Sequence, residues 1–189
     1  MTENNSVAVI ELSSIYKGYD VLDAVLKGAN VEKMVARTIC SGKYFLMFRG
    51  DSANIQAAVE IAKTAGGFSV INAAAIQNPS PAIFPAISGC TILEKRSIEN
   101  PGAILIIETF SVVTAIKAAD YAVKEADIDI LRIHVAMAVG GKGFVVMTGD
   151  VASLEAAVKP ALEYIKGDGM LSGYTIIQNP HEDILKELI

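Results

Sequence analysis

The chain has 189 residues, of which 52% are hydrophobic and only 20% are charged, and its formal net charge is −5. Its Lys and Arg residues do not cluster, which argues against nucleic acid as a partner. No apolar run approaches the roughly 18 residues of a membrane-spanning helix, and the polar N-terminus lacks a signal-peptide pattern. We therefore expect a cytoplasmic protein with no membrane partner, whose apolar excess is buried at interfaces between subunits.

The first half of the chain alternates between strand and helix patterns. Strands are expected at residues 7–12, 31–39, 44–48 and 70–77. The spacing i, i+3, i+4, i+7 predicts one helix through Leu22, Val25, Leu26 and Ala29 and another through Ile55, Ala58, Val59 and Ala62. Asp51 is a candidate N-cap for the second helix, which Gly66-Gly67 should end. The predicted unit is β-α-β-β-α-β.

The second half repeats the first. Glu11 recurs as Glu108, and Gly50-Asp51 recurs as Gly149-Asp150. The four residues from Ile76 to Pro79 recur unchanged as Ile177 to Pro180. Because a repeat of this length indicates a duplicated structural unit, the sequence predicts two tandem domains. We expect them at 1–85 and 103–189, joined by a linker at 86–102.

The two copies differ in two places. Pro160 lies inside the last amphipathic stretch of the second copy, where it should kink the helix because proline lacks a backbone donor. The turn Cys40-Ser41-Gly42-Lys43 aligns with Val139-Gly140-Gly141-Lys142, so only the first copy carries a thiol.

From the residues alone, Cys40 is either a buried structural thiol or a ligand or reactive group beside a lysine. Cys90 and His134 are expected to be packing residues, and His181 is a solvated residue or lies at a helix start. The glycines around Lys142 lack the ending of a phosphate-binding loop. With no catalytic triad, carboxylate pair or dinucleotide fingerprint, the sequence does not predict an enzyme.

The repeated sequence segments resemble those of bacterial microcompartment shell proteins. In that family a strand ends in Glu, a helix reads Ala-Asp-x-x-x-Lys-x-Ala-x-Val, and a Gly-rich pore loop precedes Gly-Asp. The matching helices here are Leu22–Val31 and Ala119–Ile128. Three further segments are most similar to the tandem-domain trimeric shell proteins of propanediol-utilisation microcompartments. They are Arg37–Lys43, Pro85–Gly89 and Gly140–Lys142.

This resemblance implies two tandem shell domains of the α/β (α+β) class, with ferredoxin-like sheets covered by helices on one face. Three chains would form a pseudohexameric tile that packs edge to edge with other shell proteins in a microcompartment within the cytoplasm. Lys27 and Lys124 are the candidate tile-edge residues. The implied pore loops comprise Ile39, Cys40, Ser41, Gly42, Lys43, Gly140, Gly141 and Lys142.

In the cluster-bearing relatives, the turn cysteines of three chains hold one 4Fe-4S cluster. Carried over, the ligand is Cys40, the backbone amides of Ser41 and Gly42 donate to the cluster sulfides, and Lys43 adds positive charge. The role would be electron or cluster transfer across the shell, with a redox enzyme as a further partner. Two alternatives stay open: a metal-free pore for small metabolites, and a small oligomeric thiol or redox enzyme that uses Cys40.

Overall fold

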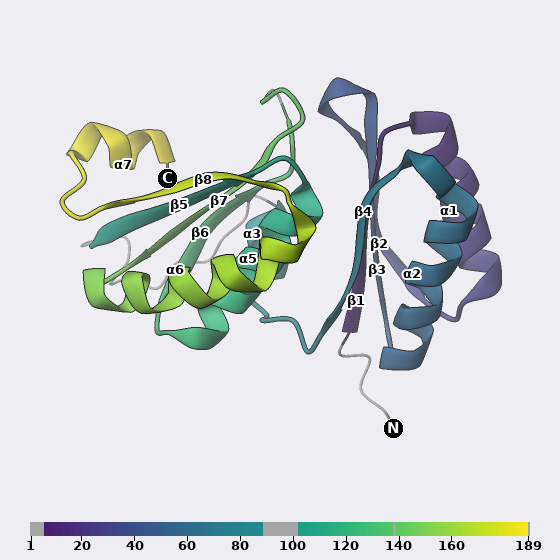
Figure 1. The fold of residues 1–189 in the computed structure, drawn as a ribbon, viewed down its shortest axis with the longest axis horizontal. Helices are drawn as coiled ribbons and strands as arrows, with labels where there is room; N and C mark the ends of the chain where they lie inside the picture. The colour runs from purple at the N-terminus through teal and green to yellow at the C-terminus, as the bar shows by residue number, and fades with distance from the viewer. Residues whose placement is uncertain (1–5, 89–101, 138, 189) are drawn as a thin grey trace. The chain divides into compact units, whose positions relative to one another are not determined.

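The structure is a computed structural model that describes residues 6–88, 102–137 and 139–188. The chain divides into two compact units, which are coloured from purple to yellow along the chain in Figure 1. The first unit runs to Pro79 and includes the segment Ala136–Gly141. The second unit comprises Ser80–Val135 and the chain from Lys142 onward.

The first unit contains the predicted order of strands and helices. Its elements are β1 (Ser6–Leu12), α1 (Ile15–Gly28), β2 (Glu32–Ile39), a 3₁₀ turn (Cys40–Gly42), β3 (Lys43–Gly50), α2 (Ser52–Gly66), a second 3₁₀ turn (Gly67–Ser69) and β4 (Val70–Gln77). Every predicted strand and helix of the first copy is therefore confirmed.

The second unit repeats this order and adds two short helices. Its elements are α3 (Ile83–Ser88), β5 (Ala103–Thr109), α5 (Val112–Glu125), β6 (Asp129–His134), β7 (Gly143–Gly149), α6 (Val151–Ile165), a 3₁₀ turn (Lys166–Asp168), β8 (Leu171–Ile177) and α7 (Glu182–Leu188). The helices α3 and α7 have no counterpart in the predicted β-α-β-β-α-β unit.

The two sheets have the same topology. Their strand orders are β2-β3-β1-β4 and β6-β7-β5-β8, and every pairing is antiparallel. In the first unit, α1 and α2 lie together on one face of the sheet (Figure 1). This is the ferredoxin-like arrangement that the family resemblance implied. The register against the last strand shifts after Glu11 in one sheet and after Glu108 in the other, so even the β-bulges are duplicated.

Apolar side chains between the first sheet and its helices form the core of the first unit. Its fully buried members include Ile10, Leu46, Phe48 and Ile55. Alternation along β1 and β3 places Ile10, Leu46 and Phe48 on one face of the sheet, where the apolar stripes of α1 and α2, the latter including Ile55, cover them. The helical spacings predicted through Val25 and through Ile55 therefore identify the helix faces that cover this sheet.

Both long C-terminal helices of the repeats begin at an aspartate cap. The Asp51 carboxylate accepts a hydrogen bond of 2.9 Å from the backbone N–H of Asn54, and Asp150 accepts one of the same length from Ser153. The hydrogen bonds from Asn54 lower the pKa of Asp51, and those from Ser153, led by its hydroxyl, lower the pKa of Asp150. The predicted N-cap at Asp51 is confirmed.

Pro160 does not interrupt its helix, because α6 is assigned as one helix from Val151 to Ile165. Burial of Leu154, Ala157 and Ile165 against the core holds the helix on both sides of the proline and offsets its missing hydrogen bond. The amphipathic pattern, not the proline, therefore decided the extent of this helix.

Most of the predicted linker, and Cys90 with it, lies outside the described residues. The helix α3 packs within the second unit, which begins at Ser80. The domain limits of 85 and 103 stay predictions. Within the described part of the chain, no helix is long and apolar enough to cross a membrane.

Candidate functional site

The Cys40 turn connects β2 to β3 in three residues. Ile39 and Lys43 face each other as the last pair of the β2–β3 ladder, and the 3₁₀ turn Cys40–Gly42 reverses the chain between them. Ser41 and Gly42 both have left-handed φ angles, 64° and 71°. A serine in this region is uncommon and glycine adopts it freely, so the backbone of the turn is specific. Cys40 is half-buried and is not in a disulfide.

The turn from the second repeat lies against the Cys40 turn. The backbone N–H of Cys40 donates a hydrogen bond of 2.8 Å to the carbonyl of Ala136. Gly140 and Gly141 also have left-handed φ angles, 63° and 81°. The predicted pore-loop residues Ile39–Lys43 and Gly140–Gly141 therefore belong to one compact unit, although about 100 residues separate them in the sequence.

Lys43 contacts both turns. Its ammonium lies 2.9 Å from the Glu11 carboxylate and donates a hydrogen bond of 2.8 Å to the carbonyl of Gly141. The Glu11 side chain is completely buried, and that of Lys43 is 16% exposed. The positive charge of Lys43, which was expected near the thiol, is therefore neutralised by a buried carboxylate.

Lys142 forms the equivalent pair of the second repeat. Its ammonium lies 3.2 Å from Glu108, and the hydroxyl of Ser172 donates a 2.8 Å hydrogen bond to the same carboxylate oxygen. The Ser172 hydroxyl, followed by Lys142, lowers the pKa of Glu108. Unlike the side chains of Glu11 and Lys43, those of Glu108 and Lys142 are each more than one-third exposed.

The two candidate edge lysines occupy matched helical positions with unequal surroundings. Lys27 pairs with Asp23 at 2.6 Å on α1, and both side chains are mostly exposed. Lys124 pairs with Asp120 at the same distance on α5, but Asp120 is buried and also accepts a 2.6 Å hydrogen bond from the backbone N–H of Ser80. A tile-edge role for the two lysines stays a prediction.

The histidines lie where structural roles were expected. His134 ends β6 with its ring 4.8 Å from that of Phe144. His181 precedes α7, and its Nδ1 accepts a hydrogen bond from the backbone N–H of Asp183. The prediction of a residue at a helix start is therefore confirmed for His181.

Within a single chain, the described residues do not form a metal site: no group of three or more His, Cys, Asp or Glu side chains comes together among them. Cys40 is the thiol of the β2–β3 turn, and a half-buried thiol in a tight turn is chemically suited to be one ligand of an iron–sulfur cluster. The donor set thus fits a shared cluster to which several chains each contribute one thiolate.

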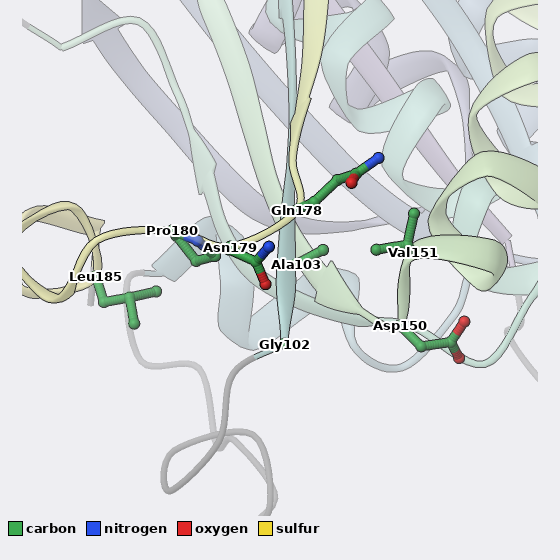
Figure 2. Close-up of a pocket in the computed structure, with 8 residues that line it drawn as sticks. All are labelled: Gly102, Ala103, Asp150, Val151, Gln178, Asn179, Pro180 and Leu185. Atoms are coloured by element: carbon green, nitrogen blue, oxygen red, sulfur yellow. The ribbon is translucent and has the colours of Figure 1, made fainter.

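A cavity of about 420 Å³ lies elsewhere, in the second unit (Figure 2). It is lined by Gly102, Ala103, Asp150, Val151, Gln178, Asn179, Pro180 and Leu185. Among these described lining residues the ionisable one is Asp150, and in Figure 2 its carboxylate points away from the others. Since that carboxylate caps α6, the described lining offers no group for acid, base or nucleophilic chemistry.

Sequence reasoning missed two residues of the Cys40 site. Glu11 was noted as a repeated strand residue but not as the partner of Lys43, and Ala136 was not singled out. The repeat contained a signal for the first, because Glu11 and Lys43 recur together as Glu108 and Lys142. A glutamate and a lysine that are both retained in a duplicate are candidates for a pair.

Comparison with known proteins identifies the repeat. The sequence matches the BMC domain over residues 6–79 and again over 103–180. It is 36% identical over 186 residues to the bacterial microcompartment shell protein PduT of Citrobacter freundii, with 98% of each chain covered.

Two solved structures resemble this chain. A microcompartment protein from Desulfitobacterium hafniense superposes with a TM-score of 0.80 at 37% identity, covering 96% of this chain and 98% of the other. The fused permuted hexameric shell protein MSM0275 of the RMM microcompartment gives a TM-score of 0.64 at 19% identity, covering 89% and 88%. The second likeness concerns the fold alone.

Proposed function

The chain belongs to the BMC-domain family of bacterial microcompartment shell proteins, and from this premise we propose that three copies form a tile whose centre binds one 4Fe-4S cluster through Cys40. The protein is a structural component of a microcompartment shell, which lies within the cytoplasm. The family is structural and not enzymatic, which favours a Cys40 that holds a group over one that turns over a substrate.

The duplication supports the trimeric assembly. Each chain carries two domains of one topology, so three chains present six similar domains around a closed ring. Because only the first domain has a cysteine in its turn, such a ring has three equivalent turn thiols and not six. The observation that carries the cluster proposal is this single thiol in the tight turn between β2 and β3.

Residues of the turn have distinct roles in this proposal. Cys40 provides the thiolate, and the backbone amides of Ser41 and Gly42 are available to donate hydrogen bonds to cluster sulfides. The Cys40 amide is not available, since it donates to Ala136. A cluster of this type accepts or releases one electron at a time, which would let the shell pass electrons, or the cluster itself, between its two sides. A redox enzyme on one side would be the partner.

The test is anaerobic purification of the wild type, Cys40→Ser and, as the matched control, Cys90→Ser. We expect about four irons and four sulfides per trimer in wild type and in the control, with an electron paramagnetic resonance signal after reduction. Cys40→Ser should lose the iron and the signal while its mass stays that of the trimer. An iron-free wild type after reconstitution would contradict the cluster and leave a tile with a thiol-lined, metal-free pore.

The tile edges are proposed to involve Lys27 and Lys124, which recur at one helical position. Replacing Lys27 by Ala should prevent the trimers from forming extended sheets in electron micrographs without changing the trimer mass. Lys166→Ala is the control, because Lys166 is about as exposed as Lys27 and likewise pairs with an acidic residue of its own chain segment, Glu163. Normal sheets from Lys27→Ala and Lys124→Ala together would exclude these lysines from the edge.

A further inference from the structure

We propose that Glu11 and Lys43 are positioning residues that hold the second repeat's turn, Ala136–Gly141, against the Cys40 turn and thereby fix the thiol. The proposal rests on the proposed function in one respect only, namely that a fixed thiol would be placed to bind the proposed cluster. Its structural claim, that one buried ion pair joins the two turns, concerns the chain by itself.

Burial makes the Glu11–Lys43 pair rigid. Glu11 lies on β1, where its neighbours in the ladder to β3 are also buried. A carboxylate with no exposed surface strongly favours a charged partner, so the Lys43 ammonium is held at 2.9 Å from it. The β-bulge after Glu11 is repeated after Glu108, so both paired glutamates precede the same backbone irregularity.

The same ammonium holds the second turn. Lys43 donates to the Gly141 carbonyl at 2.8 Å, across 98 residues of sequence. The approach is so close that a Cβ at Gly141 would lie 3.2 Å from Ser41 Oγ and 3.3 Å from Lys43 Cε. The φ of 81° favours glycine at 141, and a Cβ there would also make Ser41 and Lys43 shift slightly.

The link continues to the cysteine. With Gly141 held by Lys43, the other end of the same turn presents the Ala136 carbonyl to the Cys40 N–H. The Cys40 backbone is thus fixed from outside its own hairpin. Loss of the Lys43 contact should release the second turn and with it the acceptor of the Cys40 amide.

The second repeat supplies a matched control. Lys142 and Glu108 are the duplicated pair, but both side chains are partly exposed. The Lys142 ammonium donates hydrogen bonds to Glu108 and to Ser172. Replacing Lys142 by Met therefore removes an equivalent ion pair without removing the hydrogen bond from Lys43 to Gly141.

The experiment measures amide hydrogen exchange of full-length wild type, Lys43→Met and Lys142→Met at peptides containing Cys40 and residues 136–141. Lys43→Met should raise exchange in both peptides at least about tenfold, as expected for losing a hydrogen bond to a charged group. Lys142→Met should change the Cys40 peptide less than about twofold. Glu11→Gln/Lys43→Met is the second variant, since it removes the link without leaving a buried carboxylate facing a methyl group, and it should behave as Lys43→Met does.

A second readout follows the thiol itself. In a Cys90→Ser background, the rate at which iodoacetamide alkylates metal-free Cys40 should change several-fold in Lys43→Met and stay that of wild type in Lys142→Met. Unchanged exchange and alkylation in both Lys43 variants, or equal effects from Lys142→Met, would overturn the proposal. An iron-free wild type would instead defeat the cluster while these two measurements still decide the role of the pair.

Discussion

Gly18 of α1 packs directly against the ring of Tyr44 in β3, so closely that a Cβ at position 18 would lie 2.3 Å from Tyr44 Cγ. Both residues are buried, and the contact sets how near α1 lies to the sheet beside the Cys40 turn. Replacing Gly18 by Ala should destabilise the protein by about 1–3 kcal/mol through overpacking, even though alanine favours helix by about 1 kcal/mol.

Thermal unfolding of Gly18→Ala checks this expectation. Gly167→Ala is the control, because a Cβ at Gly167 meets no atom within 4 Å. If Gly18→Ala melts at or above the wild-type temperature, α1 does not pack on Tyr44 as the structure has it.

Asp120 and Asp23 occupy the same helical position in the two repeats and should differ in importance. Asp120 is buried between the Lys124 ammonium and the Ser80 N–H, whereas the Asp23–Lys27 pair is exposed. Asp120→Ala should lower the free energy of unfolding by about 2 kcal/mol, since hydrogen bonds to a charged group are lost in a buried place. Asp23→Ala should cost no more than about 0.5 kcal/mol. Denaturant titration of both variants measures the difference, and equal effects would contradict the unequal burial.

Glu108 should make stability depend on pH. The Ser172 hydroxyl and then Lys142 lower its pKa in the folded state, so folding favours the ionised carboxylate. The resulting stabilisation is fully present above the ordinary carboxyl pKa of about 4.3 and is lost as the pH falls through the lower folded value.

Wild type should therefore melt above Glu108→Gln at pH 7, and the gap should close in acid. Ser172→Ala removes the first cause of the lowered Glu108 pKa. In a Ser172→Ala background, the difference in melting temperature that Glu108→Gln causes at pH 7 should therefore be smaller. Melting curves between pH 7 and pH 3 test this, and a gap that stays constant over the whole range would exclude the carboxylate as its source.

The terminal helix α7 should contribute to stability through one side. Leu185 and Leu188 pack against a cluster of Ile104, Leu131 and Val146 in the second unit, while Ile184 is exposed. Leu185→Ala should cost about 1–2 kcal/mol because the leucine is only partly buried. Ile184→Ala, one residue earlier on the same helix, should be close to neutral in chemical denaturation. A larger loss at Ile184 than at Leu185 would show that the helix presents its other side to the cluster.

The repeat unit could be predicted from the sequence because its determinants are local. The apolar run in residues 7–12, the helical spacing from Ile55 to Ala62 and the capping position of Asp51 each report burial or hydrogen bonding within a few residues. A duplicated chain carries each of these signals twice, which is why the β-α-β-β-α-β order is found in both units, whereas α3 and α7 lie outside that order. The helix α6 continues through Pro160 because packing along it outweighs one local breaker.

The surroundings of Cys40 could not be predicted in the same way. That the turn holds a thiol, flanked by small residues and a lysine, is plain in the sequence. The contacts of the turn, however, join segments that are 32 to 98 residues apart in the sequence. Lys43 pairs with Glu11 and donates to Gly141, and Ala136 accepts from the Cys40 amide. Such pairings arise only when the sheet brings β1 beside β3 and the second repeat's turn is folded into the first unit. The sequence by itself determined the duplicated fold and its one turn thiol, whereas the tertiary structure decided what holds that thiol in place, because burial of a charge selects its partner across space and not along the chain.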